Sequence, residues 1–182
     1  MIYTPERKHQ QHAARQKGAA LVISLILLVI MTLLGLAGIR GITQQERMAN
    51  HSLDRSLAFQ ATEAALRNVE GLVEANKPTP AAGAGCSVVS GLMSCSAPVA
   101  TDSPRWLDDS FASWTALASV GTGSLAVTPE YFVEFLGSDF ECRPGEGTAS
   151  GITCKRYRIT ARSHDGSSAR SSVMLQSIYA TD

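Results

Sequence analysis

The stretch AALVISLILLVIMTLLGLAGI, residues 19–39, contains no charged residue, and its only hydroxyl-bearing residues are Ser24 and Thr32. A helix of this length rises about 31 Å, which is enough to cross the hydrocarbon core of a bilayer. A helix in the core of a soluble protein would show a polar stripe along one face, and this stretch shows none. Lys17 and Arg40 bound it on either side. The stretch therefore predicts a membrane-spanning helix.

Residues 1–18 form a short basic leader before this span. The leader carries a net charge of +3, whereas residues 19–182 carry a net charge of −3. Basic residues stay on the cytoplasmic side, so we expect a single-pass inner-membrane protein with its N-terminus inside and a periplasmic C-terminal head. A secretory signal peptide is the alternative, but its apolar region is usually shorter and a small-residue cleavage site follows it.

The composition limits the class of protein. The 182 residues correspond to about one domain. The formal net charge is zero, so the whole chain lacks the basic excess of a nucleic-acid-binding protein. Hydrophobic residues make up 45% and charged residues 18%, which favours a packed domain over a disordered chain.

The helical pattern continues beyond the span. Residues 41–76 are rich in Ala, Leu, Gln, Glu and Arg, and Pro78 and Pro80 follow. Apolar residues at helical spacing predict a buried face made of Leu53, Leu57, Ala61, Ala64, Ala65, Leu72 and Val73. Charged residues predict the opposite, solvated face, made of Arg47, Asp54, Arg55, Glu63, Arg67, Glu70 and Glu74. We expect one helix from Ala19 to about Ala75, apolar on all sides first and amphipathic afterwards.

Three glycines, Gly35, Gly38 and Gly41, lie in the middle of this predicted helix. Each costs about 1 kcal/mol relative to alanine in a helix interior. Close packing against a neighbouring helix, a weak point where the helix extends, and the loose end of the span all fit this spacing. The sequence leaves these three interpretations open.

The remainder predicts a small head with a sheet. Residues 78–104 read as a loop, and Ser103-Pro104 predicts the start of a short helix with Leu107, Phe111, Trp114 and Ala118 on one face. Residues 130–136, 157–162 and 171–179 are rich in strand-forming residues, and His164-Asp165-Gly166 predicts a turn. The fold class is therefore α+β, with one long N-terminal helix packed on a small antiparallel sheet.

Four cysteines, Cys86, Cys95, Cys142 and Cys154, lie on the predicted outer side of the membrane. An even number in an oxidising compartment favours disulfides, and three pairings exist. Sequence proximity favours Cys86 with Cys95 and Cys142 with Cys154, each closing a short loop. A zinc site would need closer spacing, so we expect no metal.

Catalytic chemistry is scarce in this sequence. His164 and Asp165 fit a turn better than a catalytic arrangement, because Asp-Gly is common turn chemistry. The acidic pairs Asp108-Asp109 and Asp139/Glu141 lack the ligand pattern of a calcium loop. A row of arginines, Arg156, Arg158 and Arg162, reads as the solvated face of a strand. We therefore expect no enzyme activity, no cofactor and no small-molecule substrate.

One arrangement is specific: Arg15-Gln16-Lys17-Gly18 directly precedes the apolar span. It is similar to the class III leader of type IV prepilins, which a prepilin peptidase cuts after the glycine. Further strings resemble PilX-type minor pilins of type IV pilus systems over about residues 14–70, and more weakly near the C-terminus. These strings are GAALV (18–22), LLG (33–35), ERMAN (46–50), DR (54–55), AFQATEAALR (58–67), YRITA (157–161) and VMLQS (173–177).

The resemblance implies a set of sites and partners. Gly18 and Ala19 would flank the processing site, Arg15 and Lys17 would supply the leader charge, and Ala19 would carry the N-methylated amine. Major pilins have a glutamate at the fifth residue after the cut, which pairs with a neighbour's terminal amine, and this chain has Ile23 there. A buried amine without a partner is costly, so the resemblance implies a place at the pilus tip.

The domain organisation that follows is a leader at 1–18, a transmembrane and filament-core helix at 19–40, an amphipathic half-helix at 41–76 and a periplasmic head at 77–182. The implied function is pilus assembly as a priming or tip-complex subunit that supports piliation and twitching motility, with other minor pilins and the major pilin as partners. A minor pseudopilin of type II secretion is the first alternative. A bitopic membrane-anchored periplasmic enzyme or sensor is the second.

Overall fold

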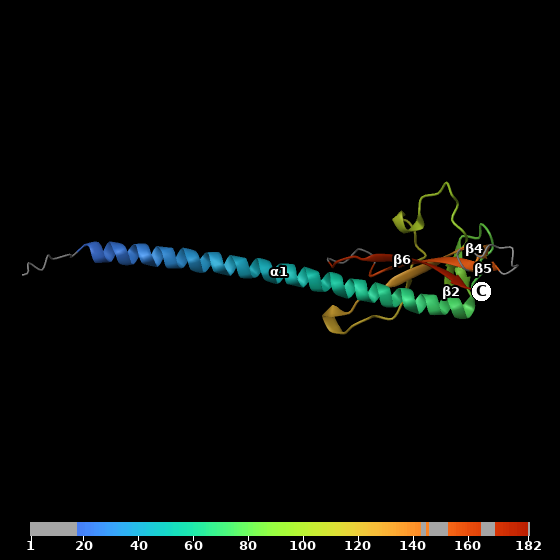
Figure 1. The fold of residues 1–182 in the computed structure, drawn as a ribbon, viewed down its shortest axis with the longest axis horizontal. Helices are drawn as coiled ribbons and strands as arrows, with labels where there is room; N and C mark the ends of the chain where they lie inside the picture. The colour runs from blue at the N-terminus through green and yellow to red at the C-terminus, as the bar shows by residue number, and fades with distance from the viewer. Residues whose placement is uncertain (1–17, 143–144, 146–152, 165–169, 182) are drawn as a thin grey trace, which may run out of the picture. The chain divides into compact units, whose positions relative to one another are not determined.

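The computed structural model describes residues 18–142, 145, 153–164 and 170–181. The chain divides into two units, residues 1–48 and 49–182. In chain order the elements are α1 (Ala19–Asn76), β1 (Cys86–Val89), β2 (Leu92–Cys95), the 3-10 turn η1 (Arg105–Leu107), β3 (Thr115–Ala116), the 3-10 turn η2 (Gly123–Leu125), β4 (Glu130–Glu141), β5 (Thr153–Arg162) and β6 (Met174–Thr181) (Figure 1).

Helix α1 runs without interruption from Ala19 to Asn76, which confirms the single long helix. An added Cβ at Gly35, Gly38 or Gly41 would meet nothing within 4 Å, so no contact in the described part of the chain requires glycine there. The helix ends at Asn76, and the next residue, Lys77, has a left-handed φ of 43° and donates its N–H to the Val73 carbonyl at 2.8 Å. Such a left-handed residue is a common helix terminator, and the proline that follows prevents continuation.

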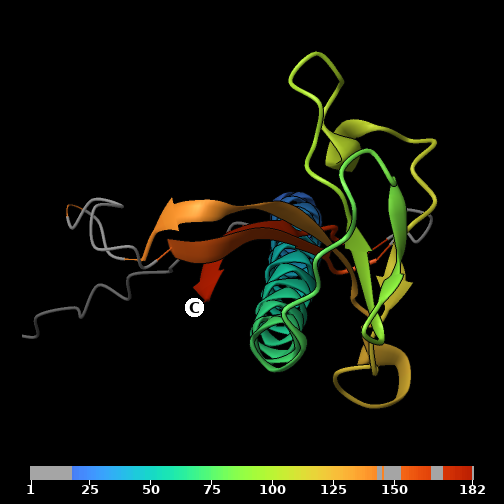
Figure 2. The same ribbon diagram turned by 90° about the vertical axis from the view of Figure 1, so that its right-hand side faces the viewer.

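The sheet has the order β1-β2-β4-β5-β6, and β3 also pairs with β4. All pairs are antiparallel except β2 with β4, so the sheet is small and mostly antiparallel as predicted. Seen along the helix axis in Figure 2, the C-terminal strands, coloured orange to red, lie across α1. Helix and sheet together give the α+β fold that the sequence predicts.

The core of the head lies between one face of α1 and the sheet. Ala65, Val69 and Val73 of α1 pack in one cluster with Tyr157 and Ile159 of β5. The buried residues of α1 are Ala58, Ala61, Thr62, Ala65, Leu66, Val69 and Val73. The predicted apolar face was therefore right for Ala61, Ala65 and Val73 but wrong for Leu53, Ala64 and Leu72, which are exposed. The buried face is built mainly from small and β-branched residues, which allow the strands to approach the helix closely.

The predicted short helix after Ser103-Pro104 is wrong. Residues 105–107 form only one 3-10 turn, and β3 follows at Thr115. Phe111 and Trp114 both contact the ring of Phe132 on β4, with ring centroids 4.7 and 4.8 Å apart. Leu107, the first residue of the predicted helical face, is 70% exposed. This segment covers the outer face of the sheet, and its aromatic contacts with β4 override the local helical spacing.

Two other expectations need adjustment. The predicted loop at 78–104 contains the hairpin β1–β2, in which Ser90 and Gly91 both have left-handed φ values. Strands β4 and β5 are longer than the predicted segments, and their register shifts on either side of Gly137. Strand β6 begins at Met174 and ends at Thr181, later at both ends than the predicted 171–179. In the predicted turn His164-Asp165-Gly166, the last two residues lie outside the described residues.

Candidate functional site

The predicted processing junction lies at the start of α1. Gly18 is an exposed turn residue, and Ala19 is the first residue of the helix. A Cβ added at Gly18 would meet nothing within 4 Å. The described chain therefore gives no packing reason for a glycine at this position. Arg15 and Lys17 lie outside the described residues.

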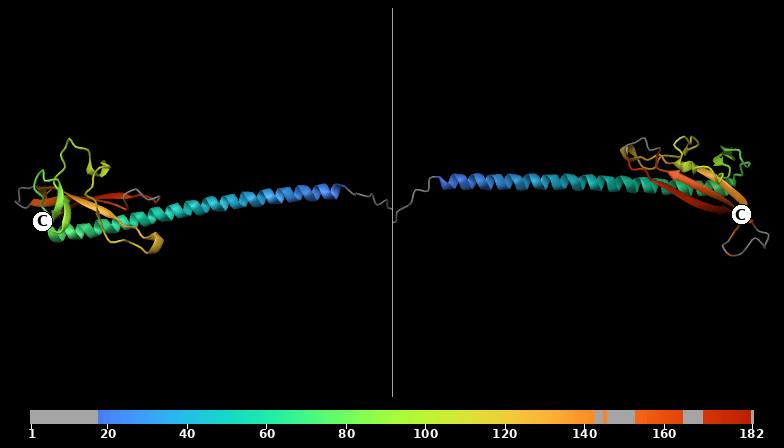
Figure 3. Two further views of the ribbon diagram at one scale, coloured as in Figure 1. Left: turned by 180° about the vertical axis from the view of Figure 1, so that it is seen from behind. Right: turned by 90° about the horizontal axis from the view of Figure 1, so that it is seen from above.

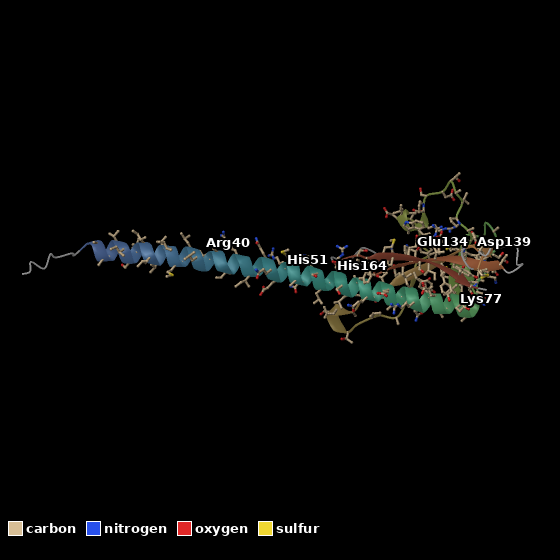
Figure 4. All side chains as sticks on the ribbon, in the orientation of Figure 1. Arg40, His51, Lys77, Glu134, Asp139 and His164 are labelled. Carbon is tan, nitrogen blue, oxygen red and sulfur yellow. A yellow bond between two sulfur atoms is a disulfide. The ribbon has the colours of Figure 1, made fainter. Side chains whose placement is uncertain are left out.

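The first unit presents an apolar helix surface. Every residue from Ala19 to Ile39 is exposed, Ile23 among them. In Figure 4 this part of the helix precedes the labelled Arg40, and its side chains project from all sides. The two hydroxyls in this stretch bond to their own helix: Ser24 donates to the Leu21 carbonyl at 2.9 Å and Thr32 to the Val29 carbonyl at 2.8 Å. Because these donors are satisfied within the helix, the surface suits an apolar environment, which suggests a membrane anchor.

In the second unit, acidic and hydroxyl side chains of α1 form a row of hydrogen bonds with β6 and with the residue just before it. Thr62 donates to the Val173 carbonyl, at 3.4 Å. Glu70 accepts from the Ser177 hydroxyl at 2.6 Å, and Glu74 accepts from the Tyr179 hydroxyl at 3.0 Å. The prediction of a solvated face is therefore wrong for Glu70, which is half-buried, and right for Glu74, which is exposed although it accepts from Tyr179. Their carboxylates fix the position of β6 along α1.

Asp54 lies nearer the start of α1 and bonds to the two residues 170 and 171, which precede this row of hydrogen bonds. One carboxylate oxygen accepts from the Arg170 Nε at 2.8 Å, and the other accepts from the Ser171 backbone N–H at 2.6 Å. Arg170 also donates to the Ala126 carbonyl at 2.8 Å. The Ser171 N–H, followed by the Arg170 guanidinium, lowers the pKa of Asp54 below its ordinary value. One carboxylate thus ties α1 to the chain just before β6, and the prediction of a solvated Asp54 is also wrong.

Three arginines of β5 lie on the outer face of the sheet, and each contacts an aromatic ring. The guanidinium carbons of Arg156, Arg158 and Arg162 lie 4.7, 4.7 and 4.0 Å from the ring centroids of Phe140, Trp106 and Trp114 respectively. The expected solvated face is therefore wrong: the outer face of β5 is covered by aromatic side chains, which attract cations through their ring faces.

The same arginines pair with acidic groups of β4. Arg162 lies 2.6 Å from Glu130, and Arg158 lies 2.9 Å from Glu134, each directly across the strand pair. Glu134 is fully buried, and it also accepts from Arg105 at 2.5 Å. Arg105 further donates to the Ser96 carbonyl at 3.0 Å. Glu134, labelled in Figure 4, therefore fastens the covering segment to the sheet.

The other candidates remain apart from one another. Asp108 accepts from the backbone and hydroxyl of Ser110, which lowers its pKa, and the exposed Asp139 lies on β4. His164 contacts the Ser171 carbonyl at 3.3 Å. Within the described ranges, no three His, Cys, Asp or Glu side chains gather where they could hold a metal ion.

Two disulfides close short loops in the head. Cys86 is joined to Cys95 and Cys142 to Cys154, which is the pairing that sequence proximity favours. The first joins the two strands of the β1–β2 hairpin, and the second joins the end of β4 to the beginning of β5. Both bonds therefore reinforce connections that the strand pairing already makes.

Sequence reasoning missed the two ionic contacts that tie distant segments together, Asp54 with Arg170 and Glu134 with Arg105. The sequence carried no signal for Arg105, but it did carry one for the pairs that Glu130 and Glu134 make with the arginines of β5. In the strand from Glu130, alternate positions place Glu130, Phe132 and Glu134 on one face, and the arginines alternate in the same way on the next strand. Complementary charges on neighbouring strands indicate cross-strand pairs. The first contact carries no such local signal, because it joins residues 116 positions apart.

Two sequence-family models match the chain. The model described as PilX N-terminal matches residues 17–67. The model described as Type IV pilus assembly protein PilX C-term matches residues 70–181. No curated protein and no solved structure matches the chain significantly.

Proposed function

Because the chain belongs to the PilX family of type IV pilus assembly proteins, we propose that it is a minor pilin of the priming or tip complex. In this proposal it helps to start pilus assembly, and its loss reduces piliation and twitching motility. Other minor pilins and the major pilin are its partners. The family is structural, which agrees with the scarcity of catalytic groups in the sequence.

Processing is the first step of the proposal. A prepilin peptidase cuts after Gly18, and the new N-terminal residue, Ala19, is methylated. The basic leader with Arg15 and Lys17 supports this step, since positive charge keeps the leader on the cytoplasmic side. The exposed position of Gly18 supports it as well, because nothing in the described fold covers the bond. The head then lies in the periplasm, where both disulfides are stable.

Ile23 is the observation that carries the proposed tip position. It is the fifth residue after the cut, where major pilins place a glutamate that pairs with the amine of a neighbour. An isoleucine side chain offers no charge for that amine, and burying an unpaired charge costs several kcal/mol, on the order of 3–5. The chain therefore fits a place where no neighbour's amine needs to be neutralised, and the end of the filament is such a place.

Replacing Gly18 by leucine tests the processing step. We expect Gly18→Leu to keep Met1 and the whole leader, because a bulky side chain blocks the peptidase site, and intact mass spectrometry reads the N-terminus directly. Gly35→Leu is the matched control, since it also adds a side chain at an open glycine of the same helix. A mature product that still begins at Ala19 in Gly18→Leu would refute the processing assignment.

The alternative of a type II secretion pseudopilin also accommodates Ile23. The family models favour the pilus, because the longer match is described as a type IV pilus assembly protein. Deleting the gene separates the two functions. Loss of surface pili with normal protein secretion supports the pilus role, whereas a secretion defect with normal piliation supports the pseudopilin. An uncleaved chain in which titratable groups converge in a pocket would support a membrane-anchored enzyme or sensor instead.

A further inference from the structure

Strand β6 forms one edge of the sheet, and its outer edge is open. It pairs with β5 on one side, and across the described ranges no strand pairs with its other side. Figure 3 shows β6, in dark red, at the margin of the sheet. The opposite edge is β1, which has only four residues and is joined to its neighbour by a disulfide. The eight-residue β6 is therefore the longer open edge.

The hydrogen-bond register identifies which backbone groups face outward. The Ser163 N–H donates to the Val173 carbonyl, so this pair is a hydrogen-bonded pair of the antiparallel ladder. Such pairs alternate along two antiparallel strands, which turns the backbone of residues 175, 177, 179 and 181 toward β5. Met174, Gln176, Ile178 and Ala180 consequently direct their N–H and C=O groups to the open edge.

This edge lacks the features that usually prevent another strand from pairing. Its sequence, MLQSIYAT, contains no charge, no proline and no glycine. Native edge strands are commonly protected by lysine, proline or a bulge, or by being short. Instead, β6 exposes apolar side chains, with Ile178 66% and Met174 41% exposed. An edge of this kind favours the addition of a further strand.

The two faces beside the edge differ in charge. On the side of α1, Ser177 and Tyr179 lie against the carboxylates of Glu70 and Glu74. The Glu74 side chain is 46% exposed, and its ion pair with the half-exposed Lys77, at 3.8 Å, leaves it accessible to a further basic group. On the other side, Met174, Ile178 and Ala180 expose apolar side chains, with the exposed Gln176 between the first two. The arginines of β5 lie across the strand pair from this row, so the charges next to it are positive and would not attract a basic side chain. A strand added here would place basic side chains near the glutamates and apolar side chains beside Ile178.

A second copy of the chain fits this edge poorly. Two identical edges related by a two-fold axis pair in antiparallel orientation. Contacts from Thr62 to Val173, Glu70 to Ser177 and Glu74 to Tyr179 show that α1 and β6 run in the same direction. Antiparallel pairing would therefore give the two α1 helices opposite directions. It would also bring Glu70 and Glu74 of both copies to the same face of the joint, where like charges disfavour pairing.

We propose that the open edge of β6 binds an extended strand of another protein, which carries apolar side chains on one face and lysine or arginine on the other. The backbone groups of Met174, Gln176, Ile178 and Ala180 supply the hydrogen bonds. Glu70 and Glu74 select the basic face, and Met174 and Ile178 select the apolar face. The inference depends on the open edge and not on the proposed position of the chain in the pilus.

A synthetic peptide of alternating lysine and valine residues is the probe, and the purified full-length chain in detergent is the target. Amide hydrogen exchange is measured residue by residue on β6. Without peptide, we expect fast exchange at residues 176, 178 and 180 and slow exchange at 175, 177 and 179. With peptide, we expect exchange at the first set to slow by about tenfold or more, since those N–H groups acquire acceptors. A peptide of alternating glutamate and valine should bind more weakly, because it faces Glu70 and Glu74.

Matched variants assign the effect to the edge. Ile178→Lys should weaken binding by about tenfold, since it places a charge on the apolar side of the edge. Val88→Lys is the control, because Val88 lies on the other edge strand and is 65% exposed. Gln176→Pro removes one outward N–H without removing a backbone bond to β5, so it should keep the fold and lose peptide binding. It also removes the hydrogen bond that the Gln176 amide donates to the Thr160 hydroxyl at 2.9 Å, and Gln176→Ala, which loses only that bond, is its control. Near-ultraviolet circular dichroism checks folding in every variant.

Three results would overturn the proposal. The first is unchanged exchange at residues 176, 178 and 180 at saturating peptide. The second is equal peptide binding by Ile178→Lys and the unmodified chain. The third is slow exchange at these residues that depends on protein concentration without peptide, which would assign the edge to a second copy. These measurements use neither the leader nor assembled pili, so their failure is distinguishable from failure of the proposed function.

Discussion

Asp54 is the residue at which α1 is tied to the segment just before β6. Asp54→Asn keeps the size of the side chain but removes the charge that accepts from Arg170 and the Ser171 N–H. Hydrogen bonds to charged groups contribute about 1.5–3 kcal/mol, so we expect the free energy of unfolding to fall by about 2 kcal/mol at neutral pH. Urea denaturation measures this difference.

The pH dependence follows from the lowered pKa of Asp54. The stabilisation is present above the ordinary carboxyl value of 3.8 and is lost as the pH falls through the lower pKa of the folded state. The stabilities of the unmodified chain and of Asp54→Asn should therefore begin to converge as the pH falls below 3.8 and become equal below the lowered pKa of Asp54. Asp139→Asn, which changes an exposed carboxylate on β4, is the control and should have little effect. If the difference in stability between the unmodified chain and Asp54→Asn stayed constant at pH values well below 3.8, the stabilisation would not come from the ionised Asp54.

Tyr157 is a second residue with a testable environment. Its side chain is fully buried, and its hydroxyl has no hydrogen-bond partner within the described structure. Burial, and then the nearby Glu74 carboxylate, raise the pKa of Tyr157 to about 12. Removing a buried hydroxyl without a partner removes a desolvation cost. We therefore expect Tyr157→Phe to raise the free energy of unfolding by about 1 kcal/mol at neutral pH.

Alkaline titration gives an independent check on Tyr157. A raised pKa means that stability is complete below pH 10 and declines as the pH rises toward 12. Tyr157→Phe should lose less stability over this interval than the unmodified chain. Tyr179→Phe is the contrasting variant, because that hydroxyl donates to Glu74 and its loss should destabilise the head. If both variants destabilise equally, the Tyr157 hydroxyl has a partner.

At the scale of elements, Glu134 is one of the contacts that hold the segment from Ser96 to Pro129 on the sheet, beside the β3–β4 pairing and the packing on Phe132. Its buried carboxylate lies between Arg105 of that segment and Arg158 of β5. Removing one member of a buried ionic group costs about 3–5 kcal/mol, because the remaining charges lose their partner. We expect a loss of this size in the free energy of unfolding of Glu134→Ala, measured by urea denaturation. Glu134→Gln, which should lose less, is the variant to measure if Glu134→Ala does not fold.

Glu63→Ala provides the comparison for Glu134. Glu63 pairs with Arg67 on the exposed face of α1, where the side chains are 41% and 76% exposed. Exposed pairs four residues apart on a helix contribute about 0.3–0.5 kcal/mol. The two glutamates should therefore differ severalfold in their effect on stability. An equally small effect for both would mean that the covering segment does not depend on Glu134.

The elements predicted correctly were those whose structure depends on residues close to one another in the sequence. Helix α1 was predicted to within a residue or two at each end, because an apolar run and a proline-marked end are both local signals. The three C-terminal strands were found for the same reason, from their strand-forming residues. Leu107 and Trp114 had helical spacing, but Trp114 packs on Phe132 of a distant strand. The helix predicted there was wrong because no local pattern reveals a tertiary contact.

The residues of the candidate site also separate into those that local sequence could indicate and those that only the folded structure brings together. The processing junction and the role of Ile23 came from the resemblance to pilins and remain predictions, since a single chain contains neither a peptidase nor a neighbour. The contacts of Asp54 and Glu134 came from the structure, because each joins segments far apart in the chain. The open edge of β6 also needed the structure, since a strand's place in a sheet is not set by its own sequence.

At the scale of the whole molecule, Ile23 should determine where the chain sits in a fibre. A charged residue at the centre of a membrane helix costs about 2.5–3.5 kcal/mol on insertion, and the neighbouring positions 22 and 23, both near the start of the span, should bear a similar and smaller cost. Only at position 23 can a glutamate neutralise a neighbour's amine in the proposed assembly. We expect immunogold labelling of the head at fibre ends for the unmodified chain, and along the shaft for Ile23→Glu. Val22→Glu is the control, because Val22 is 55% and Ile23 57% exposed, and it should be absent from fibres. Shaft labelling by the unmodified chain would contradict a tip position and leave Ile23 without the proposed role.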